Sequence, residues 1–132
     1  MTVGVVLVSH SATVAESVAH MAAGLNGGGA KVPVAAAGGT PDGGLGTDAE
    51  KITAAAHSVD RGDGVAVIAD LGSAVLTVKT LLADEDELPP RTRLVDAPFV
   101  EGAVAAVVTA STGADLDAVV AAAQEAYTFR KG

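Results

Sequence analysis

The feature that most constrains the fold is the apolar run Val3-Gly4-Val5-Val6-Leu7-Val8, which stops at Ser9-His10-Ser11. A mostly β-branched run without polar alternation is typical of a strand buried on both faces, as in parallel sheets. A helix is expected next, because apolar residues recur with helical spacing at Val14, Val18, Met21 and Leu25. His10 is therefore expected in a strand-to-helix turn, at the sheet edge where ligands bind in open α/β folds.

Composition narrows the class of protein. The chain has 132 residues, the size of one domain, so we expect a single domain over 1–132. It contains no cysteine, which excludes disulfides and thiolate metal sites, and it begins without the features of a signal peptide. No run has the length of a membrane helix, so we expect a cytoplasmic protein. A net charge of −8 argues against nucleic acid and anionic membranes as partners.

Strand-like and helix-like segments alternate along the chain. The second apolar run, 32–37, contains Pro33, which cannot donate to a strand ladder and so predicts an edge strand. Further strands are expected at 65–69 and 92–95. Thr47 is expected to cap a helix, with Glu50 completing a capping box. The later helices are expected to bury, in chain order, Ile52, Ala55, Ala56 and Val59; Val75, Val78, Leu81 and Leu82; Val100, Val104, Val107 and Val108; and Leu116, Val119, Val120, Ala123 and Tyr127.

This alternation predicts an α/β fold. We expect an open, mostly parallel, flavodoxin-like sheet of four strands in the order 2-1-3-4, with helices on both faces. Two consecutive helices after the fourth strand leave room for an extra edge strand. The acidic cluster 84–87 before Pro89-Pro90 is expected to be a solvated loop.

The expected strand order brings two titratable residues together. His10 ends the first strand and Asp70 the third, and the crevice opens between these strands because the chain leaves them in opposite directions. An Asp that binds one ring nitrogen fixes the tautomer and leaves the other nitrogen as a nucleophile. The simpler alternative is that Asp70 only caps the following helix. His20 and His57 lie off the apolar helix faces and are expected to be solvated.

Small polar residues surround the expected pair. Helix N-termini and hydroxyl groups suit a phosphoryl group, and each Ser or Thr alone would otherwise serve as a helix cap. The candidates are Ser9, Ser11, Thr13, Gly72 and Ser73. The glycine-rich loop 38–47, a second candidate, starts at the same edge and could cover the site or form a flexible rim. Its candidate residues are Gly39, Thr40, Gly46 and Thr47, without the Gly-Lys-Ser/Thr of a P-loop.

Several segments resemble the mannose-type enzyme IIA family, in the form found in phosphoenolpyruvate-dependent dihydroxyacetone kinases. They are Val5-Val6-Leu7-Val8-Ser9-His10-Ser11, Gly39-Thr40 with Gly46-Thr47-Asp48, Ala69-Asp70-Leu71-Gly72-Ser73-Ala74 and Ala97-Pro98-Phe99-Val100-Glu101-Gly102-Ala103. They occur in order over almost the whole chain. In sugar-transport relatives a Gly-Gly-Ser-Pro-like run often follows the Asp-Leu, and Gly72-Ser73-Ala74 departs from it.

The resemblance implies a specific activity. His10 would take a phosphoryl group from the phosphocarrier protein HPr and pass it to ADP on the nucleotide-binding kinase subunit. The family implies the flavodoxin-like fold and a homodimer, and the chemistry needs no metal or other cofactor. Some family members carry extra phosphocarrier domains, and because the sequence ends at Gly132 we expect an external carrier.

Three alternatives remain open from the sequence. The chain could be the enzyme IIA of a mannose-type sugar transporter. It could be a small tetrapyrrole metal chelatase, which would need a second His or a Glu at the same edge. It could also be a non-catalytic adaptor in which His10 is inert.

Overall fold

The computed structural model describes residues 1–27 and 29–132 of the chain. Strands and helices alternate along them up to the fourth strand, and two helices follow it. The elements are β1 (Gly4–Ser9), α1 (Ala12–Gly24), β2 (Val34–Gly38), α2 (Ala49–Val59), β3 (Val65–Ala69), α3 (Gly72–Ala83), β4 (Thr92–Val95), α4 (Phe99–Ser111), α5 (Leu116–Glu125) and the 3₁₀ turn η1 (Ala126–Thr128).

The sheet has the predicted topology. Its order is β2-β1-β3-β4, and all three strand pairs are parallel. Every residue of β1 is buried, as its unbroken apolar sequence indicates, and β2 is an edge strand as Pro33 predicts. The flavodoxin-like α/β prediction is therefore confirmed. Within the described residues the sheet ends at β4, so the extra edge strand is not found there.

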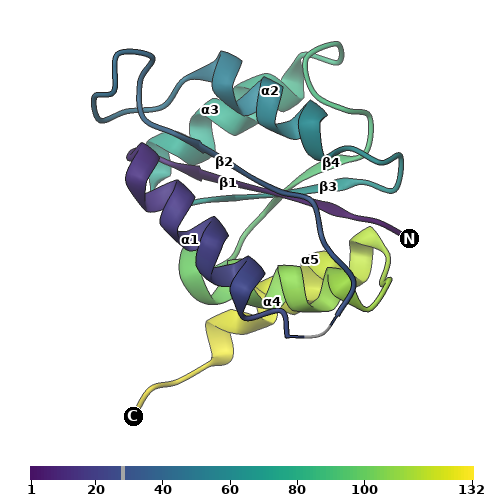
Figure 1. Ribbon diagram of the computed structural model, residues 1–132. Helices are drawn as coiled ribbons and strands as arrows, with labels where there is room; N and C mark the ends of the chain where they lie inside the picture. Colours follow the sequence, from purple (N-terminus) through teal and green to yellow (C-terminus); the bar gives the residue numbers. More distant parts are fainter. Residues whose placement is uncertain (28) are drawn as a thin grey trace.

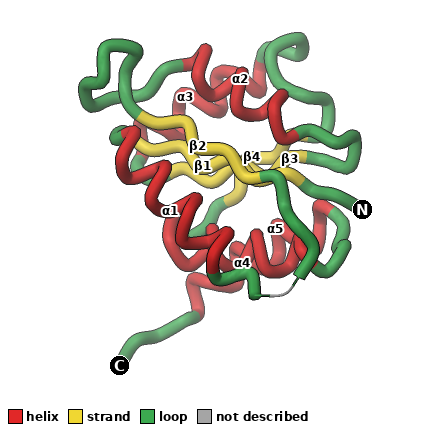
Figure 2. The backbone as a smooth tube through the Cα atoms, in the orientation of Figure 1, coloured by secondary structure: helices red, strands yellow, loops and turns green. Residues whose placement is uncertain are grey.

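Helices cover both faces of the sheet. Helices α2 and α3 lie on one face, while α1, α4 and α5 lie on the other (Figure 1). The tube view separates the layers, with the strands between two layers of helix (Figure 2). Alternate residues of β1 feed the two cores: Val5 and Leu7 pack toward α1, α4 and α5, and Val6 and Val8 toward α2 and α3.

Two helices bury a different face from the one expected. In α1 the buried residues are Ala15, Val18 and Ala22, whereas Val14, Met21 and Leu25 are exposed. In α4, Val107 is buried as expected and Val104 partly so, but Val100 and Val108 are exposed. The rest of the α4 contact consists of Gly102, Ala103, Ala106 and Ala110. Small residues let these helices pack closely against their neighbours. The larger apolar side chains therefore lie at the edge of the contact, where they are exposed.

The other helices agree more closely with the expected pattern. Helices α2 and α5 bury the predicted residues apart from Tyr127, which lies beyond α5 and is 60% exposed. In α3, Val78 and Leu81 are buried, and Val75 and Leu82 are partly buried.

One predicted cap is displaced by one residue. Asp48 rather than Thr47 caps α2, because its carboxylate accepts a hydrogen bond from the Lys51 amide at 3.0 Å.

No helix within the described residues is both long and apolar enough to cross a bilayer.

Candidate functional site

The crevice between β1 and β3 brings His10 and Asp70 into contact. Each residue directly follows its strand, and the Asp70 amide donates to Val8 O at 3.0 Å, which joins the two strand ends. The His10 Nδ1 atom lies 2.9 Å from Asp70 Oδ1. The side chains are 23% and 15% exposed, so the pair is neither solvated nor sealed. Sequence reasoning placed both residues at this edge, and the structure gives their direct contact.

Asp70 is held by four hydrogen bonds from its surroundings. Besides the His10 ring, the donors are the Ser9 hydroxyl at 2.8 Å, the His10 amide at 3.1 Å and the Leu71 amide at 2.7 Å. The N-cap of α3 is Leu71, so the Asp70 carboxylate does not take the capping position considered as its alternative role. Its hydrogen bonds instead fix the carboxylate against the imidazole.

The same contacts set the charge of Asp70. Partial burial acts to raise the pKa of its carboxyl group. The hydrogen bonds from the His10 amide, the Ser9 hydroxyl, the His10 ring and the Leu71 amide together outweigh burial and hold this pKa below its ordinary value. Asp70 is therefore a carboxylate at neutral pH and can stabilise positive charge on the neighbouring ring.

The tautomer of His10 follows from this contact. A carboxylate can only accept, so Nδ1 carries the ring hydrogen and Nε2 keeps its lone pair. The Nε2 atom is in hydrogen-bond contact with Ser73 Oγ in the first turn of α3. No side chain caps the start of α3, so the amides of Gly72 and Ser73 have no partner within the helix, in the same turn that carries the Ser73 hydroxyl. Nε2 thus sits next to donors that suit an anionic oxygen.

The remaining candidates occupy different positions. Ser9 is buried beneath the pair, where its hydroxyl donates to Asp70 and accepts from the Ser11 amide at 3.1 Å. Ser11 caps α1 by accepting from the Val14 amide at 3.3 Å, and Thr13 is exposed in the first turn of that helix. Ser9 therefore contacts the Asp70 carboxylate and not the Nε2 atom of His10. His20 and His57 are exposed, as expected.

The loop that follows β2 is attached to the site at both ends; we call residues 39–47 the rim loop. The Gly39 amide donates to Ser9 O at 3.3 Å, and Gly39 has φ 74°, a conformation that favours glycine. At the other end, the Gly46 amide donates to His10 O at 2.8 Å. Between them, the Thr40 hydroxyl contacts Asp42 and accepts from the Gly44 amide at 2.9 Å. The rim loop is thus anchored around the site.

Sequence reasoning missed two residues that hold this region. Lys51 Nζ donates to Gly38 O at 3.2 Å and to Thr40 O at 3.1 Å, which fixes the start of the rim loop. The Thr77 hydroxyl on α3 contacts the Thr47 hydroxyl at the end of the rim loop. The spacing of Ser73 and Thr77, one helical turn, could have indicated that they share a face. The Lys51 contacts depend on the path of the loop and left no signal in the sequence.

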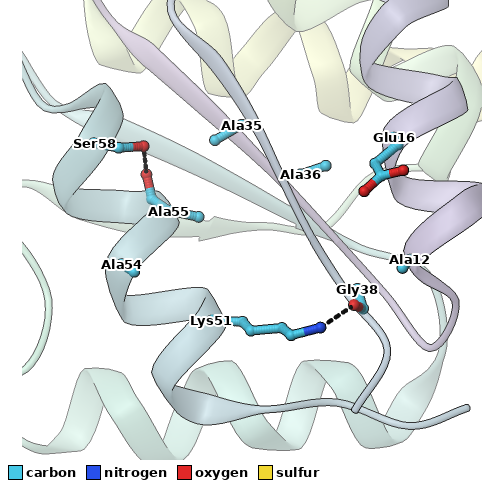
Figure 3. A pocket seen from close by; sticks show the side chains of 9 residues that line it. All are labelled: Ala12, Glu16, Ala35, Ala36, Gly38, Lys51, Ala54, Ala55 and Ser58. Carbon is cyan, nitrogen blue, oxygen red and sulfur yellow. Dashed lines mark hydrogen bonds between the residues drawn. The ribbon is translucent and has the colours of Figure 1, made fainter. Parts of the chain in front are cut away.

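A shallow groove of about 460 Å³ lies beside this site but does not contain His10. It runs along the outer edge of β2 between α1 and α2, and small side chains such as Ala36 and Ala55 line most of it (Figure 3). His10 and Asp70 lie at the neighbouring sheet edge, where their side chains are partly open to solvent. Among residues 1–27 and 29–132, no group of three or more His, Asp or Glu side chains is arranged to hold a metal ion.

Comparison with known proteins agrees with this arrangement. The EIIA-man family, described as "PTS system fructose IIA component", matches residues 4–120. The phosphoryl donor subunit DhaM of the PEP-dependent dihydroxyacetone kinase from Escherichia coli K12 is 41% identical over 133 residues, covering 98% of this chain and 28% of that protein. The corresponding subunit of PEP-dependent dihydroxyacetone kinase 2 from Listeria innocua is 34% identical, covering 89% of this chain and 94% of the relative.

A solved structure extends the agreement to three dimensions. The crystal structure of EF1359, a protein of unknown function, has a TM-score of 0.84 and 36% identity, and the match covers 100% of this chain and 98% of that one. The chain spans little more than a quarter of the E. coli relative but most of the Listeria one. The matched range includes His10, Asp70 and the rim loop, and the resemblance seen in the sequence is confirmed. The chain belongs to the EIIA-man family of phosphotransferase-system enzyme IIA components.

Proposed function

We propose that this chain is a phosphohistidine carrier in which His10 Nε2 accepts and donates the phosphoryl group. The observation that carries the proposal is the hydrogen bond between Nδ1 and Asp70, 2.9 Å long, which leaves Nε2 as the nucleophile. Ser73 and the start of α3 supply donors beside it. The open sheet edge suits a residue that must meet two partners in turn.

The proposed donor is the phosphohistidine of HPr. The Nε2 lone pair of His10 attacks the phosphorus, a new N–P bond forms, and the N–P bond of the donor breaks with its electron pair returning to the donor ring. The phosphorylated ring of His10 keeps its Nδ1 hydrogen and is cationic. The carboxylate of Asp70 stabilises that charge, so the proton stays on Nδ1.

The proposed acceptor is ADP bound to the nucleotide-binding subunit of a dihydroxyacetone kinase. A terminal phosphate oxygen of ADP attacks the phosphorus, the N–P bond breaks, and ATP and neutral His10 result. The names of the E. coli and Listeria relatives support this acceptor over a mannose-type enzyme IIB. The motif Asp70-Leu71-Gly72-Ser73-Ala74 supports it as well.

We further propose that the chain acts as a homodimer. Tyr127 and Phe129 are 60% and 53% exposed although they are two of the three aromatic residues of the chain. An exposed aromatic pair is unusual on a monomer surface and fits an interface between copies.

The phosphorylation site is tested by mass spectrometry. Incubation with phosphoenolpyruvate, enzyme I and HPr should add one phosphoryl group to the chain, and His10→Ala should remove this label. His20→Ala and His57→Ala serve as matched controls and should be labelled like the wild type, since both residues are exposed and neither ring is among the hydrogen-bond partners of Asp70 in the described residues. Label on His20 or His57 would refute the assignment, and an unlabelled wild type would leave the adaptor hypothesis as the better one.

The acceptor is tested with isolated phosphorylated protein. It should lose its label to the kinase subunit loaded with ADP and keep it in the presence of a mannose-type enzyme IIB. The reverse preference would assign the chain to a sugar-transport system.

A further inference from the structure

We propose that Thr77 is a positioning residue for phosphoryl transfer, which sets the place of Ser73 against His10 Nε2 through a chain of hydroxyl contacts. Thr77 lies on α3 and touches neither the imidazole nor the carboxylate of Asp70 by any hydrogen bond among the described residues. The proposal rests on the phosphocarrier function of His10 but adds a residue outside the reacting pair.

The hydroxyl of Thr77 makes two contacts, one within α3 and one to the rim loop. It donates to Ser73 O, one helical turn earlier, at 3.0 Å. It also lies 3.1 Å from the hydroxyl of Thr47. A threonine hydroxyl has one hydrogen, and that of Thr77 is directed at Ser73 O, so the Thr47 hydroxyl is the donor in the second contact. The resulting chain runs from Thr47 to Thr77 to the backbone of Ser73.

The far end of this chain is firmly held. Three consecutive residues attach the end of the rim loop to three different elements. The Gly46 amide binds His10 O at the end of β1 at 2.8 Å, Thr47 binds Thr77 on α3, and Asp48 caps α2. These contacts connect α3, through Thr77, to the residue that follows β1. Their direct consequence is a fixed separation between the residue that carries Nε2 and the helix that carries Ser73 Oγ.

The start of the rim loop is also held in place, so it cannot easily shift to compensate for a movement of residues 46–48. Lys51, in the first turn of α2, donates to Gly38 O and Thr40 O, and the contact with Gly38 is drawn in Figure 3. The rim loop is therefore fixed at both ends to α2, by Lys51 and by Asp48. Ser73 O keeps its helical hydrogen bond from the Thr77 amide, but loss of the Thr77 hydroxyl removes the contact with Thr47 and so releases α3 from this frame.

Such a release should be visible at the imidazole itself. Ser73 Oγ contacts the nitrogen that is to be phosphorylated, so a shift of the first turn of α3 changes the hydrogen bond to Nε2 before any reaction takes place. After phosphorylation the same hydroxyl can donate to a phosphoryl oxygen. Thr77 thus affects both states of His10 through Ser73.

The first test is nitrogen NMR of the His10 ring in the unphosphorylated protein. Thr77→Val removes the hydroxyl with little change of shape and should move the Nε2 resonance in the direction that Ser73→Ala moves it. Thr77→Ser keeps both contacts and should restore the wild-type resonance. Thr80→Val is the matched control, because the Thr80 hydroxyl makes the same type of helical hydrogen bond to Leu76 O at 3.0 Å without a contact to the rim loop.

The second readout is the rate of phosphoryl transfer from HPr. Loss of one well-placed hydrogen bond should slow Thr77→Val and Thr47→Val by roughly three- to tenfold each, and the double variant by no more than either alone. Thr47→Val also decides the question if Thr77→Val fails to fold.

An unchanged Nε2 resonance in folded Thr77→Val and Thr47→Val, or an equal effect of Thr80→Val, would overturn the positioning role. An unphosphorylated wild type would instead overturn the carrier function, and the NMR comparison would still decide on Thr77.

Discussion

The crevice between β1 and β3 and the C-terminal segment, residues 127–132, both contain paired polar side chains, but the pairs differ in kind. In the crevice, Asp70 is 15% exposed and receives hydrogen bonds from two backbone amides as well as from side chains. In the C-terminal segment, the Tyr127 hydroxyl donates to Asp96 at 2.7 Å and Lys131 pairs with Glu101 at 2.7 Å, and both contacts are exposed.

This difference indicates which contacts can fix the geometry and the charge of a side chain. Backbone amides at the ends of buried strands cannot move independently, so Asp70 and the ring it binds are held in one geometry. Exposed pairs are screened by water and cost side-chain entropy, so they contribute little to stability or orientation. The hydrogen bond to Asp96 raises the pKa of Tyr127, which is a local effect on an exposed group.

The largest expected effect is that of Asp70→Ala on phosphoryl transfer. The variant removes the acceptor that fixes the His10 tautomer, and the loss of an orienting hydrogen bond of about 1–3 kcal/mol corresponds to a rate roughly ten- to a hundredfold lower. Rapid-quench measurement of transfer from phosphorylated HPr gives this rate, and circular dichroism checks the fold.

The matched control for this comparison is Asp117→Ala. Asp117 also pairs with a nitrogen-bearing side chain, Arg93 at 2.7 Å, but the Asp117 side chain is 88% exposed. Its removal should leave the transfer rate unchanged. Equal rates for wild type and Asp70→Ala would remove the distinction between the crevice pair and an ordinary surface pair.

The next effect concerns the backbone that carries the crevice. A Cβ at Gly38 would lie 2.5 Å from Ser11 O and 2.9 Å from Ala12 Cα, so Gly38→Ala forces β2 away from the start of α1. We expect the free energy of unfolding to fall by about 1–3 kcal/mol in denaturant titration. Gly24→Ala, at the end of the same helix with no heavy atom within 4 Å of the added Cβ, should be neutral or slightly stabilising. Equal stability of the two variants would contradict the close approach.

A smaller effect should appear in the pH dependence of stability. The folded-state pKa of Asp70 lies below its ordinary value, so the folded protein favours the carboxylate. This contribution is present above the unfolded-state pKa and is lost as the pH falls through the folded-state pKa. The destabilisation caused by Asp70→Asn should thus be greatest above about pH 5 and shrink below about pH 4. A destabilisation independent of pH over this range would contradict the carboxylate as the stabilised form.

The sequence predicts the crevice well because strand ends are marked by abrupt changes of chemistry. His10 and Asp70 each follow an unbroken apolar run, and parallel pairing brings the ends of β1 and β3 to one edge whatever the details of packing. The hydrogen bonds around Asp70 could not be predicted in detail, because two of them come from amides whose directions depend on the turn after each strand.

Prediction was weaker where burial depends on small residues. Hydrophobic spacing assigns Met21 and Leu25 to the core, but α1 approaches the sheet through Ala15 and Ala22. Alanine carries little hydrophobic signal, so the pattern of larger residues indicates the wrong face. The predicted burial of Tyr127 was also wrong, because α5 ends at Glu125. The turn that follows directs the ring outward although the helical spacing continues.

The smallest effect on the fold is expected from truncation after Ala126, which removes the whole C-terminal segment. Its contacts to Asp96 and Glu101 are exposed, so the midpoint of thermal unfolding should change little. If Tyr127 and Phe129 form the proposed interface, sedimentation equilibrium should give twice the chain mass for the full chain and a single mass for the truncated one.

Leu25→Ser, which removes an exposed apolar side chain from the end of α1, should leave the dimer intact. Transfer from HPr to His10 should persist in the truncated monomer, since none of the hydrogen bonds that hold His10 and Asp70 comes from residues 127–132. A truncated chain that stays dimeric would place the interface elsewhere. A truncated monomer that no longer accepts the phosphoryl group would mean that the exposed C-terminal segment supports the crevice after all.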